Sequence, residues 1–246
     1  MVKNKIKSAC LVIIGNEILT GRTQDKNINH IARGLFKVGV LLNYVCVIPD
    51  VKKIIIKELR RLKKNFDYVI TTGGIGPTHD DITAESVSIA VGREYKLHQG
   101  ALRDLTRYYK KIKSELTDAR KKMAYMPSGS KLIKNKVSGA PGFNIENIYV
   151  FAGIPSIVEA MMREFVKSIQ NKNKFYSSSI ITSLFESKIA HILEVAEKNF
   201  NDVSIGSYPI FDGRPKGVEV VISSLSNKKN AQKAKKFIQT QINKII

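Results

Sequence analysis

The chain has 246 residues, of which 43% are hydrophobic, enough for one large folded domain with or without a second small one. No apolar run approaches the roughly 20 residues that a membrane-spanning helix needs, so no membrane partner is expected. Its 41 Lys and Arg against 21 Asp and Glu give a net charge of +20. The basic runs carry no interleaved aromatic residues, so we expect only weak, nonspecific attraction to nucleic acid.

Strands and helices alternate through the first part of the chain. Apolar runs at 8–14, 40–48 and 67–71 predict buried strands, and amphipathic stretches at 27–38 and 51–66 predict helices between them. This alternation favours an α/β fold, a three-layer α/β/α domain with a mostly parallel sheet. Ligands of such folds bind at the carboxyl ends of the strands, so the polar residues that follow these strands should converge in one crevice.

The rest of the chain predicts the end of this domain and a second, smaller one. The elements expected next are a long basic helix at 99–124, strands at 131–133 and 145–151, and a helix at 156–169. A polar, charged stretch at 171–174 marks a boundary between domains at 1–172 and 175–246. Beyond it we expect a small α+β domain, with strands at 178–184, 203–208 and 217–223 and helices at 187–200 and from 230 on.

A glycine-rich loop follows the third predicted strand. Its residues are Gly73, Gly74, Ile75, Gly76, Pro77 and Thr78. Glycines between a strand and a helix let backbone N–H groups approach an anion closely, so we expect this loop to bind phosphate or pyrophosphate. A tight turn is the simpler alternative. The loop is not a Walker A sequence, because the Lys-Ser/Thr pair is missing.

Carboxylates follow two of the predicted strands. Asp80 and Asp81 come after the glycine loop, and Asp50 comes after the second strand. One of the two adjacent aspartates is expected to cap the next helix. The other, together with Asp50, offers oxygen ligands to Mg²⁺ or a similar divalent metal. Asp50, Asp80 and Asp81 are therefore the predicted metal ligands.

The motifs resemble, in order along the chain, those of the MoaB/Mog molybdopterin-binding superfamily. The segment TTGGIGPTHDDIT at 71–83 carries most of the resemblance. The other matching segments are IGNEILTG at 14–21, Asp25-Lys-Asn27, VIPD at 47–50, GAPGF at 139–143, FAGIP at 151–155 and IGSYP at 205–209. Within the superfamily, the chain most resembles the N-terminal domain of competence/damage-inducible protein A (CinA) and the molybdopterin-binding-like domain of eukaryotic FAD synthases.

The resemblance implies roles for individual residues. Asp50 and Asp81 match positions implicated in metal binding and catalysis. The implied ligand-binding residues outside the glycine loop are Glu17, Gly142, Gly153 and Pro155. Asp25 either binds the ligand or caps the helix that begins near Asn27.

Three functions follow as expectations. The first is a CinA-like, metal-dependent nucleotide pyrophosphatase that hydrolyses ADP-ribose, FAD or a related dinucleotide. The second is molybdopterin binding or adenylyl transfer in molybdenum cofactor biosynthesis, and the third is a non-catalytic basic binding module. The resemblance also implies a homo-oligomer, a dimer or trimer. Cys10 and Cys46 fall in predicted strands, and buried reduced thiols fit a cytoplasmic location.

Overall fold

A computed structural model describes residues 6–169, 174–211 and 215–245. The chain divides into two compact units, an N-terminal unit of Lys7–Asn171 and a C-terminal unit that takes in Lys172–Ile246. Most of the predicted boundary at 171–174 lies outside the described residues. No helix in the described part of the chain is both long and apolar enough to span a bilayer.

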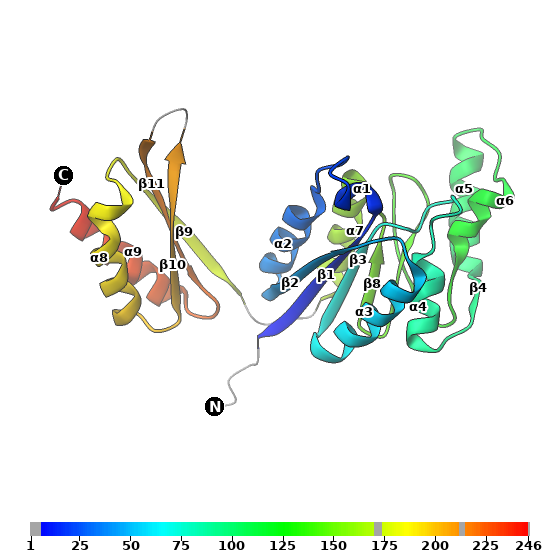
Figure 1. Ribbon diagram of the computed structural model, residues 1–246, viewed down its shortest axis with the longest axis horizontal. Coiled ribbons are helices and arrows are strands. Elements are labelled where there is room, and N and C mark those ends of the chain that lie inside the picture. The colour runs from blue at the N-terminus through cyan, green and yellow to red at the C-terminus, as the bar shows by residue number, and fades with distance from the viewer. Residues whose placement is uncertain (1–5, 170–173, 212–214, 246) are drawn as a thin grey trace. The chain divides into compact units, whose positions relative to one another are not determined.

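The N-terminal unit is built on a six-stranded, mostly parallel sheet of order β2-β1-β3-β8-β7-β6 (Figure 1). Its strands are β1 (Lys7–Ile14), β2 (Val40–Ile48), β3 (Tyr68–Thr72), β6 (Lys131–Ile133), β7 (Gly142–Ile145) and β8 (Ile148–Phe151). β1 pairs in parallel with β2 and β3, and β3 pairs in parallel with β8. β7 is antiparallel to both β8 and β6.

Helices cover both faces of this sheet. α2 (Asn27–Lys37) and α7 (Pro155–Ser168) pack on one face, and α3 (Lys52–Asn65) and α4 (Thr83–Val91) pack on the other. β1 is buried on both sides, because its residues alternate between the two hydrophobic cores: Ala9, Leu11 and Ile13 in one, Cys10, Val12 and Ile14 in the other. The predicted three-layer α/β/α fold is confirmed.

Two local predictions are wrong. The expected helix at 99–124 is α5 (Gln99–Lys111), a break with Lys113 at φ 52°, then the short α6 (Asp118–Lys121) and the 3₁₀ turn η1 (Lys122–Ala124). The expected strand at 145–151 is a hairpin of β7 and β8, in which Ile145 pairs with Ile148 and Glu146 has φ 52°. A small two-stranded sheet, β4 (Tyr95–Leu97) with β5 (Tyr125–Pro127), and the one-turn α1 (Asn16–Leu19) complete the unit.

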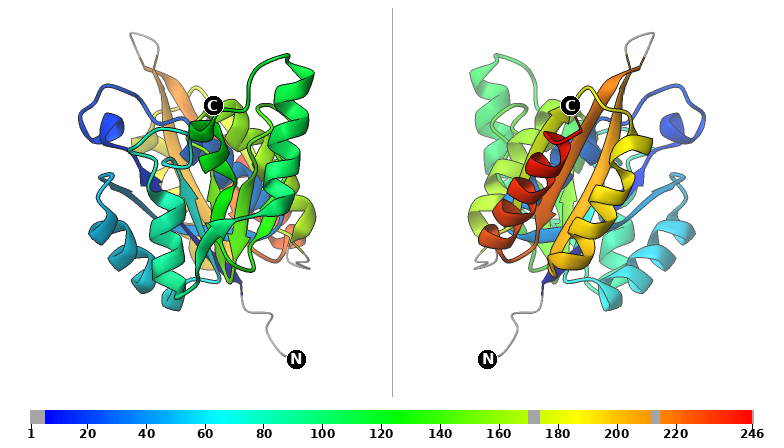
Figure 2. Two further views of the ribbon diagram at one scale, coloured as in Figure 1. Left: turned by 90° about the vertical axis from the view of Figure 1, so that its right-hand side faces the viewer. Right: turned by 90° about the vertical axis from the view of Figure 1, so that its left-hand side faces the viewer.

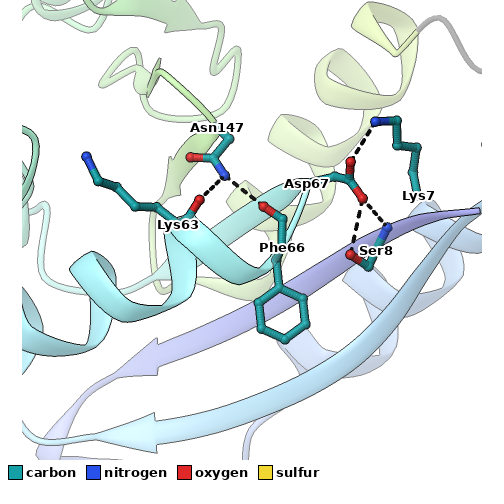
Figure 3. A network of polar contacts seen from close by, with 6 residues as sticks. All are labelled: Lys7, Ser8, Lys63, Phe66, Asp67 and Asn147. Carbon is teal, nitrogen blue, oxygen red and sulfur yellow. Dashed lines mark hydrogen bonds and ion pairs between the residues drawn. The ribbon is translucent and has the colours of Figure 1, made fainter.

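Side-chain hydrogen bonds connect neighbouring elements at the amino ends of the parallel strands. Asp67 accepts hydrogen bonds from the Lys7 ammonium group (2.6 Å) and from the N–H (2.9 Å) and hydroxyl (3.2 Å) of Ser8, which joins β1 to β3 (Figure 3). Asn147, in the β7–β8 turn, donates to the carbonyl oxygens of Lys63 (2.9 Å) and Phe66 (2.8 Å) at the end of α3. These contacts fix the start of β3, and with it the place where the glycine loop leaves the sheet.

The C-terminal unit is the predicted α+β fold. Its elements are β9 (Tyr176–Thr182), α8 (Glu186–Asn199), β10 (Val203–Phe211), β11 (Pro215–Ser224) and α9 (Lys228–Ile242). The three strands form an antiparallel sheet of order β10-β11-β9. α8 and α9 lie side by side on this sheet (Figure 2), and buried aliphatic residues of both helices and all three strands form one core.

Candidate ligand-binding and catalytic site

A cavity of about 610 Å³ lies at the carboxyl ends of the parallel strands of the N-terminal unit. This volume is within the usual range for small-molecule sites. The predicted site residues that line it are Glu17, Asp50, Gly73, Gly74, Ile75, Gly76, Pro77, Thr78, Asp80, Asp81, Gly153 and Pro155. The expected convergence of residues that follow β1, β2 and β3 in one crevice is therefore confirmed, and the loop after β8 joins them.

The glycine loop presents unpaired backbone donors. Gly73 and Gly74 have φ of 97° and 66°, the left-handed region that favours glycine. The N–H of Gly73 donates to the carbonyl oxygen of Phe151 at 3.3 Å. The next three N–H groups, of Gly74, Ile75 and Gly76, have no hydrogen-bond acceptor among the described residues. Successive free N–H groups in such a loop form an anion-binding nest.

Asp81 is held against the loop by Thr78. Its Oδ2 accepts from the N–H of Thr78 at 2.8 Å and from the Thr78 hydroxyl at 2.5 Å. A side chain on Gly76 would collide with this carboxylate, since a Cβ there would lie 2.6 Å from Oδ2. The expectation that Asp80 or Asp81 caps the next helix is wrong: α4 begins after Ile82 without a side-chain cap, because Asp81 turns back to Thr78.

Asp50, which follows β2, is held by a backbone N–H group that follows β1. This half-buried residue accepts from the N–H of Asn16 at 2.8 Å through Oδ2, which joins the end of β2 to the start of α1. The second carboxylate oxygen, Oδ1, of Asp50 and of Asp81 has no hydrogen-bond partner in the described ranges. Both residues therefore have an oxygen available for a cation or ligand.

Charged side chains surround these two aspartates. Asp80 is exposed, and the neighbouring Thr78 side chain holds the pKa of Asp80 below its ordinary value, helped by its own backbone N–H and by His79 and Lys122. Lys122 donates to the carbonyl oxygen of Thr78, which places a positive charge beside the loop. Glu17 is exposed on α1.

The donor set fits a metal that is shared with a ligand. Residues 6–169, 174–211 and 215–245 contain no group of three or more His, Cys, Asp or Glu side chains that could hold a metal ion by themselves. Mg²⁺ commonly binds through one or two carboxylates and completes its octahedron with phosphate oxygens and water. Asp50 and Asp81 each offer one free oxygen in the cavity that also contains the glycine loop.

Three other predicted positions have structural contacts of their own. Gly142 is buried in β7 and does not line the cavity, and a Cβ there would collide with the carbonyl oxygen of Val150. Gly153 lies against the glycine loop, because a Cβ on it would be 3.4 Å from the Cα of Gly73. Asp25 accepts from the N–H of Ile28 at 2.9 Å, so it caps the first turn of α2.

Several residues that line the cavity were not predicted. They are Thr23, Tyr109, Met123, Ser138, Ala140 and Ile154, among others. Tyr109 comes from α5, and the guanidinium of Arg120 lies 4.5 Å from the centre of its ring. Ala140 and Ile154 lie inside the GAPGF and FAGIP segments, although no ligand contact was predicted for them. The other four come from segments without glycine motifs or strand ends, and no signal in the sequence distinguishes them from other surface positions.

The fold and the cavity define a three-layer α/β/α protein with a ligand-sized site at the carboxyl end of its sheet. Residues 10–171 match the model of a family described as probable molybdopterin binding domain. The match covers more than half of the chain, and the chain belongs to this family. Residues 174–246 match the model of the middle domain of FAD synthase.

Similar proteins agree with this assignment. A protein from Pyrococcus furiosus is 34% identical over 247 residues, covering 94% of this chain and 95% of the relative. A protein from Archaeoglobus fulgidus is 31% identical over 227 residues, covering 92% and 95%. The crystal structure of the protein CinA, of unknown function, from Thermoplasma acidophilum has 31% identity and a TM-score of 0.61, covering 67% of this chain and 98% of CinA. The resemblance drawn from the motifs is confirmed.

Proposed function

We propose that this protein is a metal-dependent nucleotide pyrophosphatase that hydrolyses ADP-ribose, FAD or a related dinucleotide. The observation that carries the proposal is the shared cavity: the unpaired N–H groups of Gly74, Ile75 and Gly76 lie in the same space as the carboxylates of Asp50 and Asp81. Donors for phosphate oxygens and oxygen ligands for a cation are the two requirements of pyrophosphate hydrolysis.

Each part of the site has a distinct task in this reaction. The loop N–H groups would hold the oxygens of one phosphate and so orient its phosphorus for in-line attack by water. Thr78 keeps the Asp81 carboxylate turned toward the loop. The backbone N–H of Asn16 holds the Asp50 carboxylate in place. A divalent cation on these two carboxylates and on the ligand would neutralise charge and lower the pKa of a bound water.

The test is hydrolysis of FAD and of ADP-ribose with Mg²⁺ or Mn²⁺, measured by the AMP that is released. Asp81→Asn should lower kcat/KM by at least about 100-fold, the scale on which loss of a single charge-stabilising group acts. Asp104→Asn is the matched control, because Asp104 pairs with Arg107 on α5 outside the cavity. Full activity in excess chelator, or in Asp81→Asn, would refute the mechanism.

Molybdopterin binding or adenylyl transfer is a second candidate, supported by the family match over residues 10–171. The same nest and carboxylates could hold the phosphate of a pterin ligand. The products separate the two reactions. Hydrolysis of a dinucleotide consumes water and needs no ATP, whereas adenylyl transfer consumes ATP and releases pyrophosphate. Pyrophosphate release that depends on added molybdopterin, without dinucleotide hydrolysis, would favour the second candidate.

The remaining expectations concern partners. A non-catalytic basic binding module would bind oligonucleotides tightly, with sequence preference and at near-physiological salt. Attraction that comes only from net charge collapses as salt rises. A homo-oligomer is expected, and light scattering at micromolar concentration should give a dimer or trimer mass rather than that of a 27.5 kDa monomer.

A further inference from the structure

The main cavity has an uncharged wall beside the glycine loop. It is formed by residues of α5, η1 and the loop before β7: Tyr109, Met123, Ser138 and Ala140. Gly139 packs on α5, because a Cβ on it would collide with the side chain of Tyr108, so the loop and the helix lie side by side. Met123 also lines a narrow cleft together with Ile75 and Gly76, which places the wall next to the glycine loop.

The wall differs in chemistry from the rest of the cavity. Within the described part of the chain, every charged side chain that lines the cavity is acidic, and all of these acids belong to other segments: Glu17, Asp50, Asp80 and Asp81. Tyr109 is the only aromatic residue in the described lining. A ligand whose phosphates lie in the glycine loop therefore meets an uncharged, partly aromatic surface next to them.

Arg120 supports the ring of Tyr109 from outside the cavity. Its guanidinium lies 4.5 Å from the centre of the ring, and Arg120 is not among the lining residues. The guanidinium donates to the Ser114 hydroxyl at 2.8 Å and to the carbonyl oxygen of Glu115, so the loop after α5 holds it in place. Tyr109 is only half-buried, unlike Leu105 one turn earlier on α5, which is completely buried. The ring is thus held in place and still reaches the cavity.

A buried amide, that of Asn135, organises the loop that carries Ser138. Its Nδ2 donates to the Ser138 hydroxyl oxygen at 2.7 Å and to the carbonyl oxygen of Ala140 at 2.9 Å. Its Oδ1 accepts from the N–H groups of Val137 at 2.8 Å and Ser138 at 3.3 Å. The Ser138 hydroxyl accepts a bond here and has no acceptor of its own among the described residues, so its O–H is available to a ligand.

We propose that Tyr109, Met123 and Ser138 bind the planar heteroaromatic ring of a nucleotide whose phosphates occupy the glycine loop. Aromatic and thioether side chains pack favourably against such a ring, and a ring nitrogen or carbonyl oxygen accepts from the Ser138 hydroxyl. The inference rests on the proposed nucleotide substrate and specifies it further. Tyr109 determines specificity, because it favours ligands with a ring over phosphate compounds that lack one.

The test compares two anions that resist hydrolysis, by titration calorimetry with Mg²⁺. They are α,β-methylene-ADP and methylenediphosphonate, which is the same anion without adenosine. Tyr109→Leu should lower the affinity for α,β-methylene-ADP by at least about fivefold, the lower end of what stacking of a base on an aromatic side chain contributes. Tyr109→Phe keeps the ring and should keep the wild-type affinity. Neither variant should change the affinity for methylenediphosphonate.

Tyr44→Leu is the matched control. Tyr44 also has a guanidinium over its ring, that of Arg61 at 5.4 Å, but it is exposed on β2 and does not line the cavity. Its substitution should leave both affinities unchanged. Ser138→Ala should lower the affinity for α,β-methylene-ADP by about threefold, the scale of one hydrogen bond. An unchanged affinity in that variant would remove Ser138 from the site.

A pterin has a ring of the same class, so the titration includes 6-hydroxymethylpterin diphosphate. Tighter binding of this compound than of α,β-methylene-ADP, lost in Tyr109→Leu, would overturn the nucleotide assignment and give the wall to a pterin. Equal affinities of the wild-type chain for α,β-methylene-ADP and methylenediphosphonate would overturn the inference without any variant. So would undiminished binding of α,β-methylene-ADP by folded Tyr109→Leu.

The outcomes also separate this inference from the proposed function. Binding of α,β-methylene-ADP that depends on Tyr109, without hydrolysis of FAD or ADP-ribose, would leave the inference standing and refute the pyrophosphatase. Hydrolysis of FAD with the same kcat/KM in Tyr109→Leu as in the wild-type chain would do the reverse. Failure of both anions to bind would overturn the inference together with the phosphate nest.

Discussion

Gly74→Ala should destabilise the N-terminal unit by about 2–5 kcal/mol, in two separable parts. Gly74 has φ 66°, and a non-glycine residue in the left-handed region costs about 1–2 kcal/mol. An added Cβ would also collide with the hydroxyl of Thr83 and lie 3.2 Å from its Cβ. Forcing a methyl group into packed surroundings costs about 1–3 kcal/mol more.

Gly92→Ala isolates the first part. Gly92, after α4, also has φ 66°, but a Cβ there would meet nothing within 4 Å. The free energy of unfolding of Gly92→Ala should therefore fall only by the backbone contribution of about 1–2 kcal/mol. Thr83→Ala removes the colliding hydroxyl but keeps the Cβ at 3.2 Å. Gly74→Ala introduced into that variant should therefore lower the free energy of unfolding by less than in the wild-type chain, approaching the effect of Gly92→Ala.

Urea unfolding followed by far-ultraviolet circular dichroism measures these differences, because the chain has no Trp for fluorescence. All four variants lie in the same unit, so the same transition midpoint should shift at an unchanged slope. Equal destabilisation by Gly74→Ala and Gly92→Ala would refute the collision with Thr83. If Gly74→Ala destabilised the Thr83→Ala variant as much as it destabilises the wild-type chain, the strain would arise elsewhere.

Two further predictions concern titratable groups. Burial raises the pKa of Asp67, but hydrogen bonds from Lys7 and Ser8 outweigh it and hold the pKa below its ordinary value. Its stabilising contribution is thus present above the unfolded pKa of about 3.9 and lost as pH falls through the lowered folded pKa. Asp67→Asn should lower the free energy of unfolding by about 1–2 kcal/mol at pH 7 and by almost nothing near pH 2. Thermal unfolding at the two pH values measures this difference, and an equal loss at both would contradict the prediction. Burial raises the pKa of the Cys10 thiol to about 12 and also raises that of the half-buried Cys46. A thiol reagent at pH 8 should therefore label Cys10 only in urea and Cys46 more slowly without urea than with it. Rapid labelling of Cys10 in the folded chain would contradict its burial.

The sequence predicted strands well where burial is continuous. Each residue of β1 from Ala9 to Ile14 is buried in one of two cores, so the run is apolar throughout and easily identified. The β7–β8 hairpin was missed because its turn, Glu146-Asn147, contains no glycine or proline. Asn147 is held there by the carbonyl oxygens of Lys63 and Phe66, a contact with a distant helix that no local pattern shows.

The break after α5 has a similar cause. The segment at 99–124 has a helical composition, yet the helix ends at Lys111. Arg120 reaches back to donate to the Ser114 hydroxyl at 2.8 Å and to the carbonyl oxygen of Glu115, and it stacks on Tyr109. Tertiary contacts thus override the helix propensity of the intervening residues.

The site residues also fall into those that local sequence patterns could predict and those that they could not. Glycines and aspartates directly after strands could be predicted, because topology brings strand ends together whatever the side chains do. Tyr109 and Met123 could not, because they reach the cavity from segments far along the chain that follow no strand of the parallel sheet.

The bond from Asn27 to Gly153 has a consequence for the growing chain. The two residues are 126 positions apart in the sequence. A nascent polypeptide that has not yet reached Ile148 can form neither this hydrogen bond nor the pairing of β3 with β8. Contacts between such distant residues form late and slow folding. On the proposed function, a nucleotide present during translation would stabilise only the finished domain, in which the strand ends that line the cavity have come together.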